Sequence, residues 1–183
     1  MINKKKKLDK YLRIKFVLDC AKGIQYLHTN GIMHRDIKTD NVLVFSVDKG
    51  IPVNAKLTDF GSSRNVNMMR SNMTFTKGIG TPMYMAPEVL DQSKYSEKAD
   101  VFSFAIVMYE TFIWGAPYPK DIFPFPWNIA EFISQGNRRS QTKDMPDWYF
   151  KIVSMGWDQQ PLNRPKIDKV VEMIEQNYSE KLQ

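Results

Sequence analysis

Four polar side chains in two short segments have the types and spacing that phosphoryl transfer requires. Asp36, Lys38 and Asn41 lie in the segment HRDIKTDN, and Asp59 begins the segment DFG. Phosphoryl transfer uses a carboxylate that receives the proton of the attacking hydroxyl, a cation beside the transferred phosphate, and hard oxygen ligands for Mg²⁺. Asp36 and Lys38 can supply the first two, and the side-chain oxygens of Asn41 and Asp59 can supply the third.

The elements that position these side chains are an amphipathic helix and a small hairpin. Apolar residues before the first segment recur at steps of three and four, which predicts a helix that Asn30 and Gly31 end. Two β-branched segments, 41–47 and 53–58, flank a turn-like sequence and predict a hairpin. A general base must reach its proton directly, so the loop that carries Asp36 is expected to face one end of this hairpin. The apolar helix positions are Ile14, Val17, Leu18, Ala21, Ile24 and Leu27.

The rest of the chain is predicted to be mainly helical. Residues 61–80 show no sustained apolar period and form a long loop, a kind of segment that is usually functional inside a compact domain. Ser96 is expected to cap a buried helix that runs to Phe112. The Pro-rich and aromatic stretch 115–126 is predicted to be irregular. Two further helices are predicted, around 147–155 and from near Pro165.

Length and composition are those of one globular domain. The chain has 183 residues, 43% of them hydrophobic, and a net charge of +6, which excludes collagen-like and wholly disordered proteins. Its single cysteine, Cys20, excludes an internal disulfide framework and is expected to be a buried, inert thiol. No apolar run approaches the ~18 residues of a membrane span, and the basic start lacks the apolar stretch of a signal peptide. A cytoplasmic location is therefore expected for this chain, and a membrane anchor in the parent protein stays an open alternative.

Two other kinds of site receive little support from the residues. The run Lys4–Lys7 could contact nucleic acid, but no aromatic residue is interleaved. Such a run is typical of a solvated terminus, and no nucleic-acid partner is expected. Two His and one Cys that lie far apart do not predict a zinc site.

The motifs HRDIKTDN, DFG and APE follow one another in the order of the protein-kinase signature set. On these motifs the chain resembles a protein kinase, and the similarity continues through Trp157 to Tyr178. The resemblance implies a partial kinase domain over residues 1–183, with an ordered core of about 8–178. It further implies the fold of the large C-terminal lobe, which is a helical bundle with a small β-hairpin and a long activation segment.

The resemblance also implies a role for each residue of the candidate site. Asp36 is the expected catalytic base, and Lys38 is the lysine that neutralises the γ-phosphate of ATP. Asn41 and Asp59 are the expected Mg²⁺ ligands. Leu43 is expected to form part of the floor beneath the adenine, so ATP and Mg²⁺ are the implied cofactors.

Five further residues are expected to hold the site in place rather than to react. His34 and Phe60 resemble two members of the hydrophobic column that couples the lobes of a kinase. Asp100 is expected to anchor the base of that column through hydrogen bonds to the backbone. Glu88 and Arg164 are expected to form the buried ion pair that fixes the end of the activation segment.

Serine/threonine specificity and control by phosphorylation follow from the same resemblance. The lysine two residues after the catalytic aspartate, and Thr81 before the APE motif, are similar to the serine/threonine pattern. Flanking residues resemble the tyrosine-kinase-like group, and within it the amoebal kinases. Arg35 resembles the arginine of kinases that phosphorylation switches on, because a guanidinium can clamp a phosphate. The expected phosphorylation sites, in order, are Thr74 or Thr76, then Ser71.

Features of a kinase N-terminal lobe are not found in the sequence. Its nine glycines do not form the pattern GxGxxG, and Lys56 lies on the wrong side of the catalytic loop to be the strand lysine of that lobe. The expected partners are ATP, a protein substrate and an N-terminal lobe that this chain lacks. Without that lobe the nucleotide pocket is open on one side, so weak or no phosphorylation by the isolated chain is expected. A pseudokinase-like scaffold or binding module without turnover stays the alternative.

Three packing positions depart from the family pattern. Phe102 stands where tryptophan is common, and Ala105 stands where glycine is common. Gly156 stands where cysteine is frequent before the tryptophan that follows. These departures indicate divergence of the core and not loss of catalysis.

Overall fold

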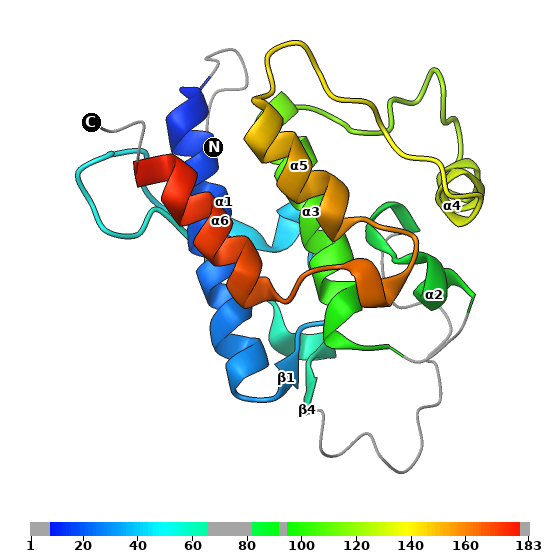
Figure 1. The fold of residues 1–183 in the computed structure, drawn as a ribbon, viewed down its shortest axis with the longest axis horizontal. Coiled ribbons are helices and arrows are strands. Elements are labelled where there is room, and N and C mark those ends of the chain that lie inside the picture. The colour runs from blue at the N-terminus through cyan, green and yellow to red at the C-terminus, as the bar shows by residue number, and fades with distance from the viewer. Residues whose placement is uncertain (1–7, 66–81, 92–94, 180–183) are drawn as a thin grey trace.

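The computed structural model describes residues 8–65, 82–91 and 95–179. Five longer helices build most of this part of the chain, and two pairs of short strands lie beside them (Figure 1). The predicted helical lobe with a small β-hairpin is therefore confirmed. The helices are α1 (Lys10–Thr29), α2 (Pro87–Leu90), α3 (Glu97–Ile113), α4 (Pro126–Ser134), α5 (Asp147–Gly156) and α6 (Ile167–Ser179).

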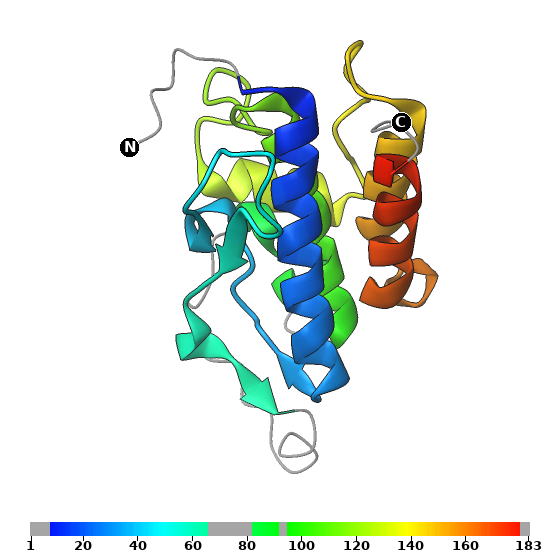
Figure 2. The same ribbon diagram turned by 90° about the vertical axis from the view of Figure 1, so that its left-hand side faces the viewer.

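Helix α1 lies at the centre of the lobe. Asp9 caps its start by accepting a hydrogen bond from the backbone N–H of Tyr11, and the chain leaves its end through Gly31 at φ +66°, as the sequence predicts. Figure 2 shows α1 between the strands on one side and α5 and α6 on the other. Cys20 on this helix is 1% exposed, and burial raises the pKa of its thiol to about 12. The prediction of a buried, inert thiol is confirmed.

Helix α3 is buried in the lobe and packs against α1 and α5. Ser96 caps it by accepting a hydrogen bond from the N–H of Lys98, and Trp114 ends it in the left-handed region at φ 55°. Nearly every side chain of the helix is buried between these two residues, as its all-round apolar sequence predicts. Among the described residues, no helix is long and apolar enough to cross a membrane.

The predicted hairpin forms, with shorter strands than expected. β2 (Val42–Val44) pairs antiparallel with β3 (Ala55–Leu57). Beyond these strands the backbone N–H groups of Phe45 and Ser46 both donate to the carbonyl of Asn54, so a loop replaces the ladder. The carboxylate of Asp19 in α1 accepts hydrogen bonds from the N–H groups of Asn54 and Ala55, at 2.7 and 3.2 Å, and ties the hairpin to the helix.

Three features differ from the sequence-based expectations. A second strand pair joins β1 (Ile32–Met33) to β4 (Arg64–Asn65). In the sequence, β1 precedes the loop that carries Asp36 and β4 follows the DFG segment. Helix α4 is not predicted by the sequence, because its nine residues follow a Pro-rich stretch and include the exposed Trp127. Helix α6 begins at Ile167, so Pro165 precedes the helix instead of lying in its first turn. Short 3₁₀ turns complete the fold at η1 (Thr39–Asn41), η2 (Phe60–Ser62), η4 (Pro82–Tyr84) and η5 (Pro161–Asn163).

Candidate active site

Asp100 holds the backbone of the loop that carries the candidate catalytic residues. Its carboxylate is fully buried and accepts hydrogen bonds from the N–H groups of His34 and Arg35, both at 2.9 Å. The hydroxyl of Tyr95 and Nε2 of His28 also contact it, at 2.6 and 2.9 Å. Burial alone would raise the pKa of Asp100, but these hydrogen bonds outweigh burial and hold the pKa below its ordinary value.

Those hydrogen bonds stabilise an unusual backbone conformation. Arg35 lies at φ 71°, in the left-handed region that residues other than glycine seldom adopt. Such a conformation costs on the order of 1 kcal/mol or more, and it persists where its surroundings fix it. Asp100 supplies that restraint from the start of helix α3, so a buried carboxylate sets the path of the loop.

His34 links this loop to the strand that precedes the DFG segment. Its side chain is fully buried, Nε2 lies 3.0 Å from the carbonyl of Thr58, and Nδ1 accepts the N–H of Asp36 at 3.3 Å. The ring centroid lies 5.3 Å from that of Phe60. The structure thus brings the two expected members of the hydrophobic column into contact, and it gives the imidazole structural partners on both nitrogens.

Three of the four candidate catalytic residues form one hydrogen-bonded cluster. Lys38 Nζ donates to Asp36 Oδ2 at 2.8 Å, and Asn41 Nδ2 donates to the same oxygen at 3.0 Å. Asn41 Nδ2 also donates to the main-chain carbonyl of Asp36 at 2.7 Å. The side chains of Asp36 and Lys38 remain 13% and 21% exposed, so a substrate hydroxyl can approach the carboxylate.

Thr58, the residue before Asp59, connects the DFG segment to the cluster. The N–H and the hydroxyl of Thr58 both donate to the carbonyl of Asn41, at 2.8 and 3.0 Å. Asp59 follows at φ 62°, is exposed, and accepts the N–H of Gly61 at 3.3 Å. Within the described residues, no hydrogen bond or ion pair joins Asp59 to Asp36 or Lys38.

The side-chain oxygen atoms of Asn41 and Asp59 are suitable ligands for a magnesium ion. The amide nitrogen of Asn41 is occupied by Asp36, which directs the amide oxygen away from it, and that oxygen has no donor within the described part of the chain. Asp59 supplies an exposed carboxylate one residue after Thr58, which is hydrogen-bonded to Asn41. Mg²⁺ prefers such hard oxygens and usually takes only one or two protein ligands beside substrate phosphates. No group of three or more His, Cys, Asp or Glu side chains able to hold a metal occurs in the described ranges.

The hairpin and the DFG segment expose apolar side chains beside this cluster. Leu43 is 55% exposed on strand β2, and Phe60 is 51% exposed at the start of η2. Both residues were expected to contact groups outside the large lobe, the adenine and the hydrophobic column. Their exposure leaves surface for such contacts.

Glu88 and Arg164 form a bidentate ion pair at the end of the activation segment. Arg164 Nη1 and Nη2 lie 2.7 and 2.8 Å from the two carboxylate oxygens of Glu88. The guanidinium also donates to the carbonyls of Asp158 and Lys98, and it lies 5.0 Å above the ring of Phe102. The arginine side chain is fully buried, so most of its donors are satisfied by fixed protein groups.

The structure adds residues that the sequence reasoning did not single out. Tyr84 donates from its hydroxyl to Glu110 Oε2 at 2.6 Å, and the hydroxyl of Thr39, next to Lys38, donates to the same oxygen at 3.1 Å. Burial raises the pKa of Glu110, although both hydrogen bonds act to lower it. Glu110 is a charged residue in the second half of helix α3, where most residues are apolar. This feature of the sequence could have identified it as a candidate.

The residues expected to control activation lie mostly outside the described part of the chain. Thr74, Thr76 and Thr81 fall in the range that the structure does not describe. Arg35 is described, and its guanidinium lies 5.5 Å above the ring of Tyr95. Its Nε is buried and has no hydrogen-bond acceptor within the described residues.

Comparisons with known proteins identify the family of these motifs. Residues 1–174 match the family model described as protein tyrosine and serine/threonine kinase. The chain is 35% identical over 160 residues to the "Probable serine/threonine-protein kinase gdt9" of Dictyostelium discoideum, which covers 87% of this chain and 10% of that protein. It is 36% identical over 163 residues to the "RGS domain-containing serine/threonine-protein kinase A" of the same organism, covering 89% of this chain and 13% of that protein.

The chain therefore spans only about a tenth of the length of these two relatives. The similarity to amoebal kinases is confirmed, and so is the C-terminal part of a kinase domain as the matching region. Membership of the tyrosine-kinase-like group stays a prediction.

Proposed function

We propose that the chain, which belongs to the protein tyrosine and serine/threonine kinase family, carries the catalytic lobe that transfers the γ-phosphate of ATP to serine and threonine hydroxyls of a protein substrate. Members of this family generally use ATP and Mg²⁺. The observation that carries the proposal is the cluster of Asp36, Lys38 and Asn41 with Asp59 beside it. Serine/threonine specificity is supported by the names of the two relatives and by the position of Lys38.

The side chains of the cluster divide the chemistry between them. Asp36 receives the proton of the attacking hydroxyl while the new O–P bond forms and the bond to the leaving ADP oxygen breaks. Lys38 Nζ neutralises charge on the transferred phosphate. Asn41 and Asp59 would hold a Mg²⁺ ion, which would supply neutralisation of phosphate charge. The ion pair of Lys38 with Asp36 orients both side chains before a substrate arrives.

A pseudokinase-like scaffold is the second candidate function. It is favoured by the open side of the site, where Leu43 and Phe60 are about half exposed. It is opposed by the retention of all four polar residues, because a surface kept only for binding has no need of a base, a lysine and two metal ligands at this spacing. We therefore favour catalysis over a scaffold role for a kinase that contains this lobe.

Residues 1–183 on their own are proposed to bind ATP weakly and to phosphorylate poorly. Among the described residues, Leu43 can contact one face of the adenine, and it is 55% exposed with no side chain covering it. A nucleotide pocket that is open on one side buries less apolar surface and excludes water less well. Both losses reduce affinity and rate.

A chimaera tests the proposal directly. The N-terminal lobe of the RGS-domain kinase relative is fused ahead of Leu8, and transfer of labelled phosphate is measured on peptides that carry Ser, Tyr or Ala at one position. Transfer to the Ser peptide alone is expected, and Asp36→Asn is expected to reduce it by a factor of about 10² or more. A folded chimaera that transfers no phosphate, or an Asp36→Asn variant that keeps full activity, would contradict the proposal.

A further inference from the structure

A cavity of about 580 Å³ lies between helices α1 and α3 and strand β2. Small-molecule sites have volumes of roughly 300–1,000 Å³ and mostly apolar walls with a few polar groups. The walls here are mostly apolar, with Phe16 and Val17 from α1, Val42 and Val44 from β2, and Val107 from α3. The space therefore has the size and the lining of a small-molecule site, and we call it the α1–α3 cavity.

Strand β2 separates the α1–α3 cavity from the expected adenine floor. Val42 and Val44 line the cavity, and Leu43 lies between them in the strand. Successive side chains of a strand point to opposite faces, so Leu43, which is 55% exposed, points away from the cavity. The cavity is thus a second site, behind the strand that carries the adenine floor.

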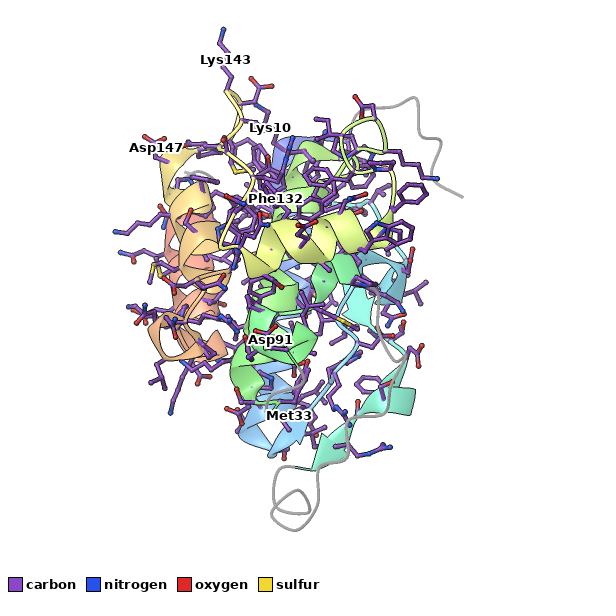
Figure 3. The ribbon with its side chains drawn as sticks, turned by 90° about the vertical axis from the view of Figure 1, so that its right-hand side faces the viewer. Lys10, Met33, Asp91, Phe132, Lys143 and Asp147 are labelled. Atoms are coloured by element: carbon purple, nitrogen blue, oxygen red, sulfur yellow. The ribbon has the colours of Figure 1, made fainter. Side chains whose placement is uncertain are left out.

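The views of the molecule agree with this position. Figure 2 shows β2 and the chain between α3 and α4 on the same side of α1. Figure 3, seen from the opposite side, shows Lys10 and the start of α1 at the same end of the lobe as that connecting chain. The first residues of that chain, Gly115 and Ala116, line the cavity.

Contacts around the α1–α3 cavity hold its walls in place. The ring of Trp114, which lines the cavity, lies 5.3 Å from the guanidinium carbon of Arg13. Arg13 Nη1 in turn donates to the carbonyl of Phe112 at 2.8 Å. Phe16 belongs to a small buried apolar cluster that includes Ala55 of β3. Walls that are already formed lower the entropic cost of binding a ligand.

Glu110 is the one charged side chain among the described residues that line the cavity. Its Oε2 accepts hydrogen bonds from the hydroxyls of Tyr84 and Thr39, at 2.6 and 3.1 Å. Its Oε1 accepts no hydrogen bond from the part of the chain that the structure describes. One carboxylate oxygen therefore keeps the capacity to accept a hydrogen bond from a ligand.

The charges around Glu110 favour a cation as that ligand. Burial raises the pKa of Glu110, and the nearby carboxylate of Asp40 raises it further, against the effect of the two hydrogen bonds. No lysine or arginine of the described residues lines the cavity. A cation at Oε1 would offset both the burial of the carboxylate and its repulsion by Asp40.

We infer that the α1–α3 cavity binds a small organic cation, which has an apolar body and one protonated amine that donates to Oε1 of Glu110. The apolar walls bury the body, and the carboxylate orients the amine. Thr39 adjoins Lys38 and shares the Glu110 carboxylate with the proposed ligand, so the cavity lies one hydrogen bond away from the catalytic loop. The inference does not rest on the proposed kinase function.

Three compounds test the inference by isothermal titration calorimetry on the full chain at neutral pH. Naphthylethylamine carries the apolar body and the amine, naphthylethanol replaces the amine with a neutral hydroxyl, and ethylamine lacks the body. The naphthyl amine is expected to bind about tenfold tighter than the alcohol, because hydrogen bonds between charged groups are the stronger ones. Ethylamine is expected to show no measurable binding, since it buries little apolar surface.

Variants locate the binding. Glu110→Gln is expected to lose the tenfold preference for the amine, and Glu131→Gln, at an exposed glutamate of α4, is its matched control. Ala116→Phe, at an exposed residue of the cavity wall, should block both naphthyl compounds without changing the carboxylate. Leu43→Ser, on the other face of β2, should leave their binding unchanged. Circular dichroism checks that each variant is folded.

Each result decides one question. Equal binding of the amine and the alcohol, or an unchanged preference in Glu110→Gln, would overturn the inference. Unchanged binding in Ala116→Phe, or loss of binding in Leu43→Ser, would place the compounds outside the cavity and would also overturn it. If Glu110→Gln does not fold, the compounds and Ala116→Phe still decide. Mg²⁺-dependent binding of ATP, measured separately, tests the proposed function, and its failure would leave a site shown by these outcomes standing.

Discussion

The two sides of the candidate site are built in opposite ways. On the inner side, Asp100 and Arg164 are buried charges whose partners are fixed groups of the protein. On the outer side, Asp36, Lys38 and Asp59 keep solvent access. The inner charges have found their partners within the fold, whereas the outer ones retain capacity for a ligand. Stability and chemistry are thereby assigned to different residues, which lie far apart in the chain.

The largest expected effect on the inner side comes from breaking the buried ion pair. Glu88→Ala leaves the fully buried guanidinium of Arg164 without its counter-charge, and a loss of about 3–5 kcal/mol in the free energy of unfolding is expected. Urea unfolding followed by circular dichroism measures it. The matched control is Glu172→Ala, which breaks an ion pair with Lys169 whose side chains are both more than half exposed. That control should lose less than about 1 kcal/mol, and equal losses would contradict the contrast.

Replacing Asp100, whose carboxylate accepts the hydrogen bonds that hold the loop, is expected to have the next largest effect. Asp100→Asn weakens charge-assisted hydrogen bonds to the loop, so a loss of about 1.5–3 kcal/mol at neutral pH is expected. The pKa of Asp100 lies below its ordinary value of 3.8, so the contribution of the carboxylate is complete above that value and disappears as the pH falls through the lowered pKa. Urea unfolding over an acid pH series should show the gap between parent and variant closing. A gap that stays constant would refute this role of the charge.

A packing change on the inner side is expected to cost somewhat less. A Cβ at position 156 would lie 2.8 Å from Cβ of Ala105, so Gly156→Ala forces helices α3 and α5 apart. Thermal unfolding should show a loss of about 1–3 kcal/mol. The double variant Ala105→Gly/Gly156→Ala exchanges the two residues and should recover much of it, whereas additive losses would show that the two positions are independent.

The smallest effect on stability is expected on the outer side. Asp59 is exposed, so Asp59→Asn should change the free energy of unfolding by no more than about 0.5 kcal/mol. The same variant should abolish the Mg²⁺ dependence of nucleotide binding, which titration of a fluorescent ATP analogue with and without a chelator measures. A loss of stability as large as that of Asp100→Asn would place Asp59 among the anchoring residues.

The sequence predicted α1 and α6 from an apolar period of three to four residues, and α3 from a long apolar stretch that begins after a capping serine. It did not predict α4, since the helix starts at Pro126, within a Pro-rich and aromatic stretch, and is only nine residues long. It also did not predict the β1–β4 pair, because two-residue strands are too short to show alternation. Local sequence carries little signal for elements that tertiary contacts define.

The candidate site follows the same division. Asp36, Lys38 and Asn41 could be selected together because they lie within one loop, and the structure joins them by hydrogen bonds. His28 and Tyr95 could not be selected, because their common partner Asp100 lies far from His28 along the chain. Contacts of that kind depend on how helices pack, which the spacing of residues in sequence does not encode.

Cys20 gives the protein an internal reporter. It is the chain's single cysteine and is 1% exposed, so a thiol-alkylating reagent should react with it after local opening of the structure around it. The rate of alkylation in native buffer therefore measures how often the lobe opens. It can be followed by mass spectrometry without any label, for the parent chain and for each variant.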